Sequence, residues 1–197
     1  MGAGNQPDRR GEGVSVRGNS WTTTVLTFSR EYVKITKDYA LAAAEAFQQI
    51  EQDEPRPFNF VYVSGAGTTH EPGPFTAIFA RVKGQTEIAL ADMRKANPLF
   101  HASTSRPAFV DPAAHDAIKP YIPQLTLPLA VTSAVLGPVI RVAVKNTWSP
   151  TEPLGNFLTR MAMGRFDHAM DGPGIQKIGA FPVIENSAIR RLMGLDK

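Results

Sequence analysis

Two polar side chains on either side of a glycine-rich segment could form a small-molecule site. Ser64 follows the apolar run FNFVYV, and Lys83 comes after the loop in a segment whose apolar residues have helical spacing. Residues four apart lie on one face of a helix, so a tyrosine four residues before Lys83 would place its phenol beside the ammonium group. The positive charge of the ammonium group would lower the pKa of that phenol. That position holds Phe79, whose ring has no proton to give. The sequence therefore offers a hydroxyl and an ammonium group without a phenolic acid beside them.

The elements that must position these residues predict an α/β fold. A helix over about 30–52 precedes a strand at 58–65, a second helix ends near 95, and a second strand is predicted within 101–110, where Pro107 stops the pairing. The strand at 58–65 lacks alternation, which is typical of a strand covered on both faces in a parallel sheet. The order helix, strand, helix, strand indicates right-handed βαβ winding. We therefore expect a partial Rossmann-like, doubly wound parallel sheet over 21–112.

The remainder of the chain is expected to complete one domain, 21–197, because a chain of this length forms a single core. Its C-terminal part, 113–197, is predicted to be mostly helical, with helices at roughly 120–145, 151–163 and 183–193. Asn186 or Ser187 could cap the last of these, and Gly194 could stop it. Residues 1–20 hold charge and glycine where a signal peptide needs an apolar middle, so we expect a disordered tail and no secretion signal.

The most apolar segment, LTLPLAVTSAVLGPVI, raises the question of a membrane. It offers only about 16 residues and contains Pro128 and Pro138, whereas a membrane span needs about 20 apolar residues. A buried or partner-facing helix is therefore the expectation, and membrane association is not expected. A peripheral membrane protein anchored through 122–144 stays open as an alternative.

Composition excludes several other classes of function. The net charge of +3 and the pI of about 9.3 come from lysines and arginines scattered along the chain, so we predict no nucleic-acid partner. The absence of cysteine excludes disulfides, thiolate-zinc sites and a cysteine nucleophile, and it fits a cytoplasmic location. The four histidines, at 70, 101, 115 and 168, show no ligand spacing, so we predict no metal site.

Three stretches resemble one protein family: FNFVYVSGAGTT, FARVKGQTE and RPAFVDP. They are similar to the middle and later parts of the atypical short-chain dehydrogenases/reductases, an NAD(P)-binding group that includes epimerase-like and Tat-interacting oxidoreductase-like proteins. The resemblance covers about residues 22–194 of the sequence. It implies a site for NADP or NAD outside the carboxyl ends of the parallel strands. It also implies catalytic positions for Ser64 and Lys83, with Thr68 as a rival hydroxyl. The residues that it places at the cofactor are Lys83, Arg106, Pro107, Ala108 and Phe109.

The sequence departs from that family in two ways. Phe79 stands where the catalytic tyrosine belongs, so the usual proton donor is missing. No strand, glycine-rich turn and helix precede residue 58 to cradle the cofactor's pyrophosphate. We therefore expect a degenerate or truncated oxidoreductase-like protein, a pseudoenzyme with little or no turnover that lacks the N-terminal nucleotide-binding half.

Other interpretations stay open at this point. The chain could be a non-enzymatic interaction module that binds a protein partner, or another copy of itself, through an exposed sheet edge. Ser64 is also compatible with a plain strand end, Lys83 with a solvated helix face, and Arg106 with an extended backbone before Pro107. Phe79 is expected in the core.

Overall fold

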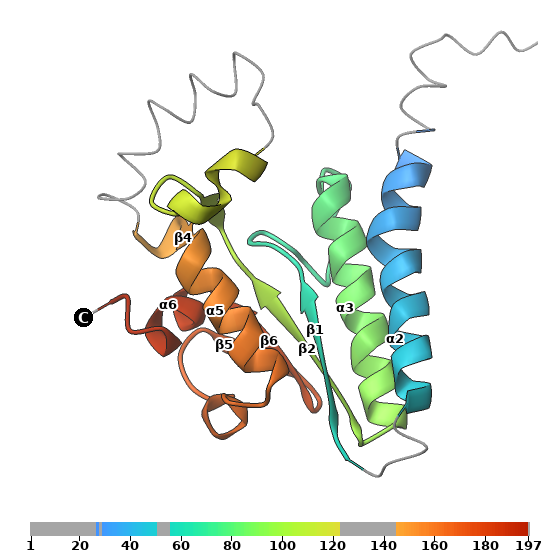
Figure 1. The fold of residues 1–197 in the computed structure, drawn as a ribbon. Coiled ribbons are helices and arrows are strands. Elements are labelled where there is room, and N and C mark those ends of the chain that lie inside the picture. Colours follow the sequence, from blue (N-terminus) through green and yellow to red (C-terminus); the bar gives the residue numbers. More distant parts are fainter. Residues whose placement is uncertain (1–26, 28, 51–55, 123–144, 197) are drawn as a thin grey trace, which may run out of the picture.

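The computed structural model describes residues 27, 29–50, 56–122 and 145–196 (Figure 1). The chain forms a mixed α/β structure around a four-stranded sheet in the order β1-β2-β6-β5. Three of the strands are parallel neighbours: β1 (Phe58–Val63), β2 (Phe100–Arg106) and β6 (Phe181–Glu185). The fourth, β5 (Ile175–Ile178), runs antiparallel to β6. The expected sheet of mainly parallel strands is therefore confirmed.

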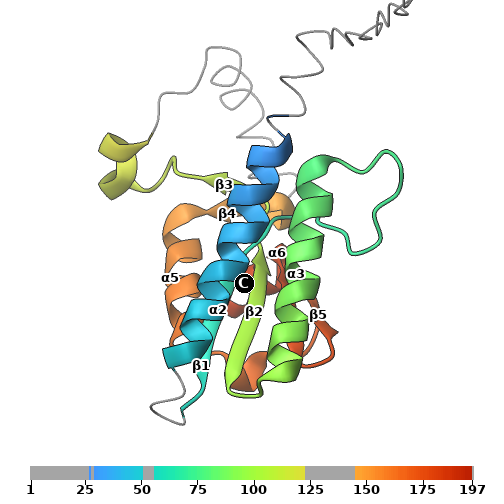
Figure 2. The ribbon, with the colours of Figure 1, turned by 90° about the vertical axis from the view of Figure 1, so that its right-hand side faces the viewer.

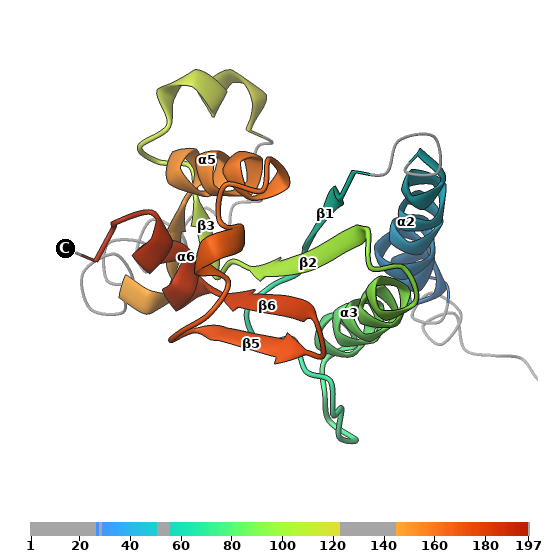
Figure 3. The same ribbon diagram turned by 90° about the horizontal axis from the view of Figure 1, so that it is seen from below.

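Helices cover both faces of this sheet, as Figure 3 shows. On one face lie α2 (Tyr39–Ile50) and α3 (Ile78–Ala96), which stand side by side in Figure 2. On the other face lie α5 (Thr151–Ala162) and α6 (Asn186–Leu192). Each face has its own hydrophobic cluster, because alternate residues of a strand point to opposite sides of the sheet. The fully buried Phe100 and Phe157 belong to the first and the second cluster, respectively.

A smaller parallel pair extends the structure beyond the ends of β1 and β2. It joins β3 (Phe109–Asp111) to β4 (Trp148–Pro150). The hydroxyl of Ser149 receives a hydrogen bond from the Ala108 amide at 3.0 Å and donates one to the Asn186 side chain at 2.6 Å. This pair therefore fixes the segment that follows β2 against the start of α6.

Most of the predicted elements are confirmed, but the C-terminal part, 113–197, was expected to be mostly helical and also contains the strands β4, β5 and β6, none of which was predicted. The helix expected over 30–52 is present, and it contains a π-helical segment at Lys34–Asp38. The predicted helix at 183–193 is wrong in its first three residues, because these belong to β6 and α6 starts only at Asn186. Gly194, with φ of 68°, ends α6 as expected.

Some expectations fall on residues that the structure does not describe. The tail at 1–20 and nearly all of the apolar segment at 122–144 lie outside the described residues. Among the helices that are described, none combines the length and the apolar character that crossing a bilayer requires.

Candidate functional site

A cavity of about 530 Å³ lies at the carboxyl ends of β1 and β2. Its lining comes from three places: the residues that end β1 (63–66), Lys83 on α3, and the segment after β2 (107–110) together with Thr147. Five of the six residues predicted to form the site line it. These are Ser64, Lys83, Pro107, Ala108 and Phe109.

The ammonium group of Lys83 is anchored at the end of β1. Its Nζ atom donates to the carbonyl oxygen of Ser64 at 2.7 Å and lies 3.4 Å from that of Val63. Burial lowers the pKa of Lys83, and the charge of Glu87 acts in the opposite direction. The lysine therefore presents a partly desolvated donor to the cavity, which suits a hydroxyl or an anionic oxygen of a ligand.

The hydroxyl of Ser64 has a different set of partners. Ser64 is only 3% exposed, and its Oγ lies 3.1 Å from Oγ1 of Thr68, the rival hydroxyl. A hydrogen bond from Ser64 also contributes to the lowered pKa of Glu87. Lys83 therefore contacts the carbonyl of Ser64, while the hydroxyl is engaged by other side chains.

Phe79 lies one helical turn before Lys83, on the same face of α3. The expectation that its ring is in the core is wrong, because the residue is 43% exposed. A Cβ atom placed on Gly67 would lie 4.0 Å from Cζ of Phe79, and one placed on Gly65 would lie 3.8 Å from Nζ of Lys83. The glycines of the loop after β1 therefore lie beside these two side chains.

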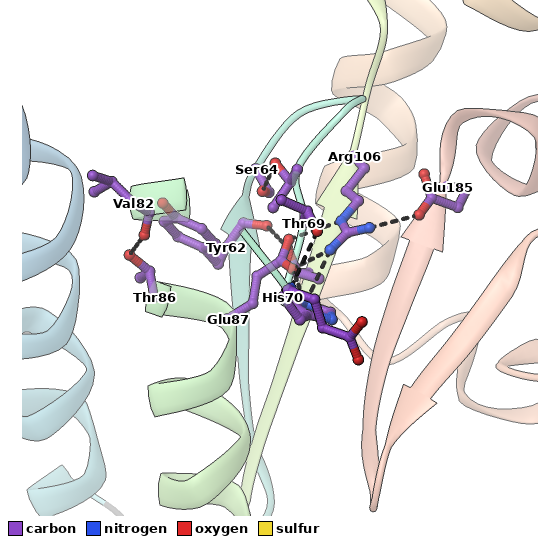
Figure 4. Close-up of polar contacts among 12 residues, drawn as sticks. Tyr62, Ser64, Thr69, His70, Val82, Thr86, Glu87, Arg106 and Glu185 are labelled. Atoms are coloured by element: carbon purple, nitrogen blue, oxygen red, sulfur yellow. Dashed lines mark hydrogen bonds and ion pairs between the residues drawn. The ribbon is translucent and has the colours of Figure 1, made fainter. Parts of the chain in front are cut away.

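A buried ion cluster joins α3 to the ends of β2 and β6 (Figure 4). Its centre is Glu87, which is fully buried. The guanidinium of Arg106 donates through Nε to Oε1 of Glu87 at 3.0 Å, and through Nη1 to Oε1 of Glu185 at 2.9 Å. The imidazole of His70 lies 2.6 Å from the other oxygen of Glu87. The same Nε2 atom also lies 3.0 Å from Nη2 of Arg106, so the imidazole contacts both members of the Arg106–Glu87 pair.

The charges in this cluster stabilise one another. Burial alone would raise the pKa of Glu87, but hydrogen bonds from Arg106 and Ser64 and the charge of Arg106 bring it below its ordinary value. Burial would lower the pKa of Arg106, but the contacts with Glu87 and Glu185 raise it. The cluster therefore favours the charged forms of the Glu87 carboxylate and the Arg106 guanidinium.

Comparison with known proteins gives one informative match. Botcinic acid biosynthesis cluster B protein 16 of Botryotinia fuckeliana (strain B05.10) is 46% identical over 156 residues, which are 79% of this chain and 99% of the relative. The chain belongs to the family of that protein. No family model and no solved structure matches it.

In this member of the botcinic acid cluster protein 16 family, Arg106 does not line the cavity at which it was expected. Its guanidinium points into the ion cluster and reaches two carboxylates there. No role was predicted for Glu87 or His70. An acidic residue among the apolar residues of an amphipathic helix could have indicated a buried ion pair, whereas nothing in the sequence indicates His70. Within the described ranges, no group of three or more histidine, aspartate or glutamate side chains is placed to hold a metal ion.

Proposed function

We propose that this chain is an oxidoreductase-like protein of the atypical short-chain dehydrogenase/reductase type. In this proposal the cavity beside Lys83 takes the nicotinamide-ribose end of NADPH or NADH, with little or no turnover. The observation that carries the proposal is the contact of Lys83 with the end of β1, at the carboxyl edge of parallel strands. Open α/β sheets bind ligands at this edge, and the crossover from β1 through α3 to β2 supports a Rossmann-like arrangement.

The residues at the cavity favour binding over chemistry. Lys83 has donors for ribose hydroxyls, and the cavity has the size of an ordinary ligand pocket. Phe79 supplies no proton, and the hydroxyl of Ser64 is engaged by Thr68 and Glu87. A positioned general acid typically contributes about 10²–10⁴-fold to a rate, so hydride transfer at this site would be slow.

The nucleotide is expected to bind weakly and through one end. A bound nicotinamide nucleotide would supply a hydride, and the pyrophosphate of such cofactors usually lies on a glycine-rich turn at a helix N-terminus. In the described residues before Phe58 there is helix and no such turn. We therefore expect dissociation constants of roughly millimolar size, set by the few groups around Lys83.

Titration with reduced nicotinamide mononucleotide and with NADPH or NADH tests this function. All three should change the nicotinamide fluorescence with similar affinity, because the adenylate end is expected to add little. Lys83→Met should weaken binding at least about tenfold, whereas Lys95→Met on the same helix should not. Micromolar binding of NADPH or NADH, steady oxidation of either, or no fluorescence change at all would each contradict the proposal.

The name of the relative suggests a setting for this activity. We infer that the chain serves the biosynthesis of a small organic product, as the relative is named for botcinic acid biosynthesis. Deletion of the gene followed by mass spectrometry of the culture extract tests this. A metabolite profile that does not change would contradict it.

A protein-interaction function is the second candidate, and α2 favours it. Among the described residues, β1 pairs on one side only and is an end strand of its sheet. The helix beside it, α2, leaves Tyr39, Phe47 and Ile50 exposed, and Ile35 in the preceding π-helical segment is exposed as well. Light scattering after gel filtration should show self-association that Tyr39→Glu weakens. A monomer at every concentration would contradict this second candidate.

A further inference from the structure

A second cavity, of about 280 Å³, lies between the first halves of β1 and β2 and the turn that follows α5. Asn59 and His101 reach it from these two strands, and Arg94 reaches it from the last turn of α3. The cavity beside Lys83 lies at the opposite ends of the same strands. The two cavities share no lining residue, so the second one is a separate candidate site.

Arg94 lines this cavity near the part of β2 that is not paired with β6. The strands β2 and β6 pair only between Thr104 and Arg106 on β2, and Pro182 near the start of β6 has no amide hydrogen to donate. The carbonyl oxygen of Ala102 instead accepts a hydrogen bond from Nη1 of Arg94 at 2.6 Å. The strands and the end of α3 can be followed in Figure 3. The guanidinium is therefore held at the level of the sheet, with its remaining N–H groups available to the cavity.

The charge of Arg94 is not neutralised by direct contact with a carboxylate of the described residues. Burial lowers its pKa, and the more distant charge of Asp167 opposes this effect. The other cation of the cavity, Lys177, is already paired with Asp171 at 2.5 Å. A ligand anion that reaches Arg94 would therefore gain a charge-assisted contact with a partly desolvated guanidinium.

Further polar groups without internal partners converge on the same space. Within the described part of the chain, the amide of Asn59 and the imidazole of His101 make no hydrogen bond. A Cβ placed on Gly164 would lie 3.1 Å from both Nδ2 of Asn59 and Oδ2 of Asp167. A donor and an acceptor of the cavity lining therefore both lie beside Gly164, and Arg94 supplies a cation.

We propose that this cavity binds a small hydroxycarboxylic acid. The carboxylate of the ligand accepts hydrogen bonds from Arg94 and from the imidazole of His101, and its hydroxyl donates to Asp167 and accepts from Asn59. Met161 and Met170 supply the apolar contacts for its short hydrocarbon part. The volume is slightly below the usual range for ligand pockets, which favours acids of a few carbons. This proposal is independent of nucleotide binding at Lys83.

NMR titration of the full chain, with ¹⁵N-labelled side chains, tests the site. Lactate should shift the Nε–Hε signal of Arg94 and the side-chain amide signals of Asn59. Acetate lacks the hydroxyl and glycerol lacks the carboxylate, so each should bind at least about tenfold more weakly than lactate. Equal shifts with lactate and acetate, or no shift with lactate, would overturn the proposal.

Two variants separate recognition from folding. Arg94→Lys keeps the positive charge and a donor toward Ala102 but loses the planar guanidinium, which can donate two parallel hydrogen bonds to a carboxylate. Lactate should therefore bind about tenfold more weakly, while the circular dichroism spectrum stays unchanged. Asp167→Asn should reduce the preference for lactate over acetate, whereas Asp92→Asn, outside the cavity, should leave it as it is. Unchanged lactate affinity in Arg94→Lys and Asp167→Asn would contradict the assignment.

Discussion

Gly84 on α3 lies directly against the carbonyl group of Thr69 in the loop that follows β1. A Cβ atom on Gly84 would be 1.9 Å from the carbonyl oxygen of Thr69 and 2.8 Å from its carbon. Both neighbouring atoms belong to the backbone, so they cannot move aside as a flexible side chain would. The loop that carries Ser64 and His70 can therefore pack this closely against α3, which carries Lys83, because residue 84 has no Cβ atom.

We expect Gly84→Ala to destabilise the protein, although alanine is the better helix former. Overpacking costs about 1–3 kcal/mol or more, which exceeds the gain of up to about 1 kcal/mol from helix propensity. Gly155→Ala on α5 is the matched control, because a Cβ there meets nothing within 4 Å. Urea unfolding should show a loss for the first variant and a small gain for the second. Equal stability of the two variants would contradict this account of the loop.

Tyr62 provides a prediction about alkaline pH. Its hydroxyl donates to the carbonyl of Thr36 in the π-helical segment at 3.2 Å, and burial raises its pKa to about 12. A raised pKa favours the neutral phenol in the folded state. The stabilisation is therefore complete below about pH 10, the ordinary tyrosine value, and is lost as the pH rises toward the folded pKa.

Tyr62→Phe measures this contribution. The variant should lose about 1 kcal/mol of unfolding free energy at neutral pH, because the hydrogen bond to Thr36 is gone. The difference from the natural chain should shrink above about pH 10. The natural chain has four tyrosines, and an absorbance titration follows their ionisation. The variant should lack the ionisation step that occurs at the highest pH. A variant that retains that late step would show that another tyrosine is responsible.

Glu87→Gln should destabilise the fold by about 3 kcal/mol at neutral pH. The substitution removes the negative charge of a buried ion pair, so the buried positive charge of Arg106 loses one of its partners. The folded-state pKa of Glu87 is depressed, so its stabilisation is present above the unfolded value of about 4.3 and is lost as the pH falls through the folded pKa. Denaturant unfolding at several pH values should show the difference narrowing in acid. A difference that does not depend on pH would contradict the charged state of Glu87. Glu71→Gln, at an exposed position of the loop, serves as the control.

How far the sequence predicts the fold can be judged from β1 and β6. The aromatic and β-branched run at 58–63 has a composition typical of a covered strand, so β1 was predicted with its ends nearly right, although its residues are mostly half-buried. The strand β6 was missed because Pro182 lies inside it and the following residues suit a helix. The sequence does contain a signal for a β-hairpin here. Gly179 and Ala180 form the two-residue turn between Ile178 of β5 and Phe181 of β6, and Gly179 adopts the positive φ of 58° that such turns favour.

The candidate site shows a similar division between local and long-range information. A strand end and the helix that follows it in a βαβ unit lie close together, so the meeting of Ser64 with Lys83 could be predicted from order alone. The partners of Arg106 could not, because Glu87 and Glu185 come from separate elements, and only the packed structure brings their side chains together. Arg106 was therefore placed at the cofactor, as the family resemblance implies, whereas its side chain belongs to the ion cluster.

Phe79→Tyr tests whether the position before Lys83 can still support an acidic phenol. The ring is 43% exposed and its Cζ has Gly67 as a neighbour, so a hydroxyl fits without displacing the core. The ammonium group of Lys83, one turn later, should bring the pKa of the new phenol below the ordinary value of about 10. The absorbance difference between variant and natural chain isolates this phenol from the other tyrosines. Adding Lys83→Met should return its pKa to about 10 or above, whereas adding Lys95→Met should not. A phenol that titrates at its ordinary value beside an intact Lys83 would show that the two groups do not interact.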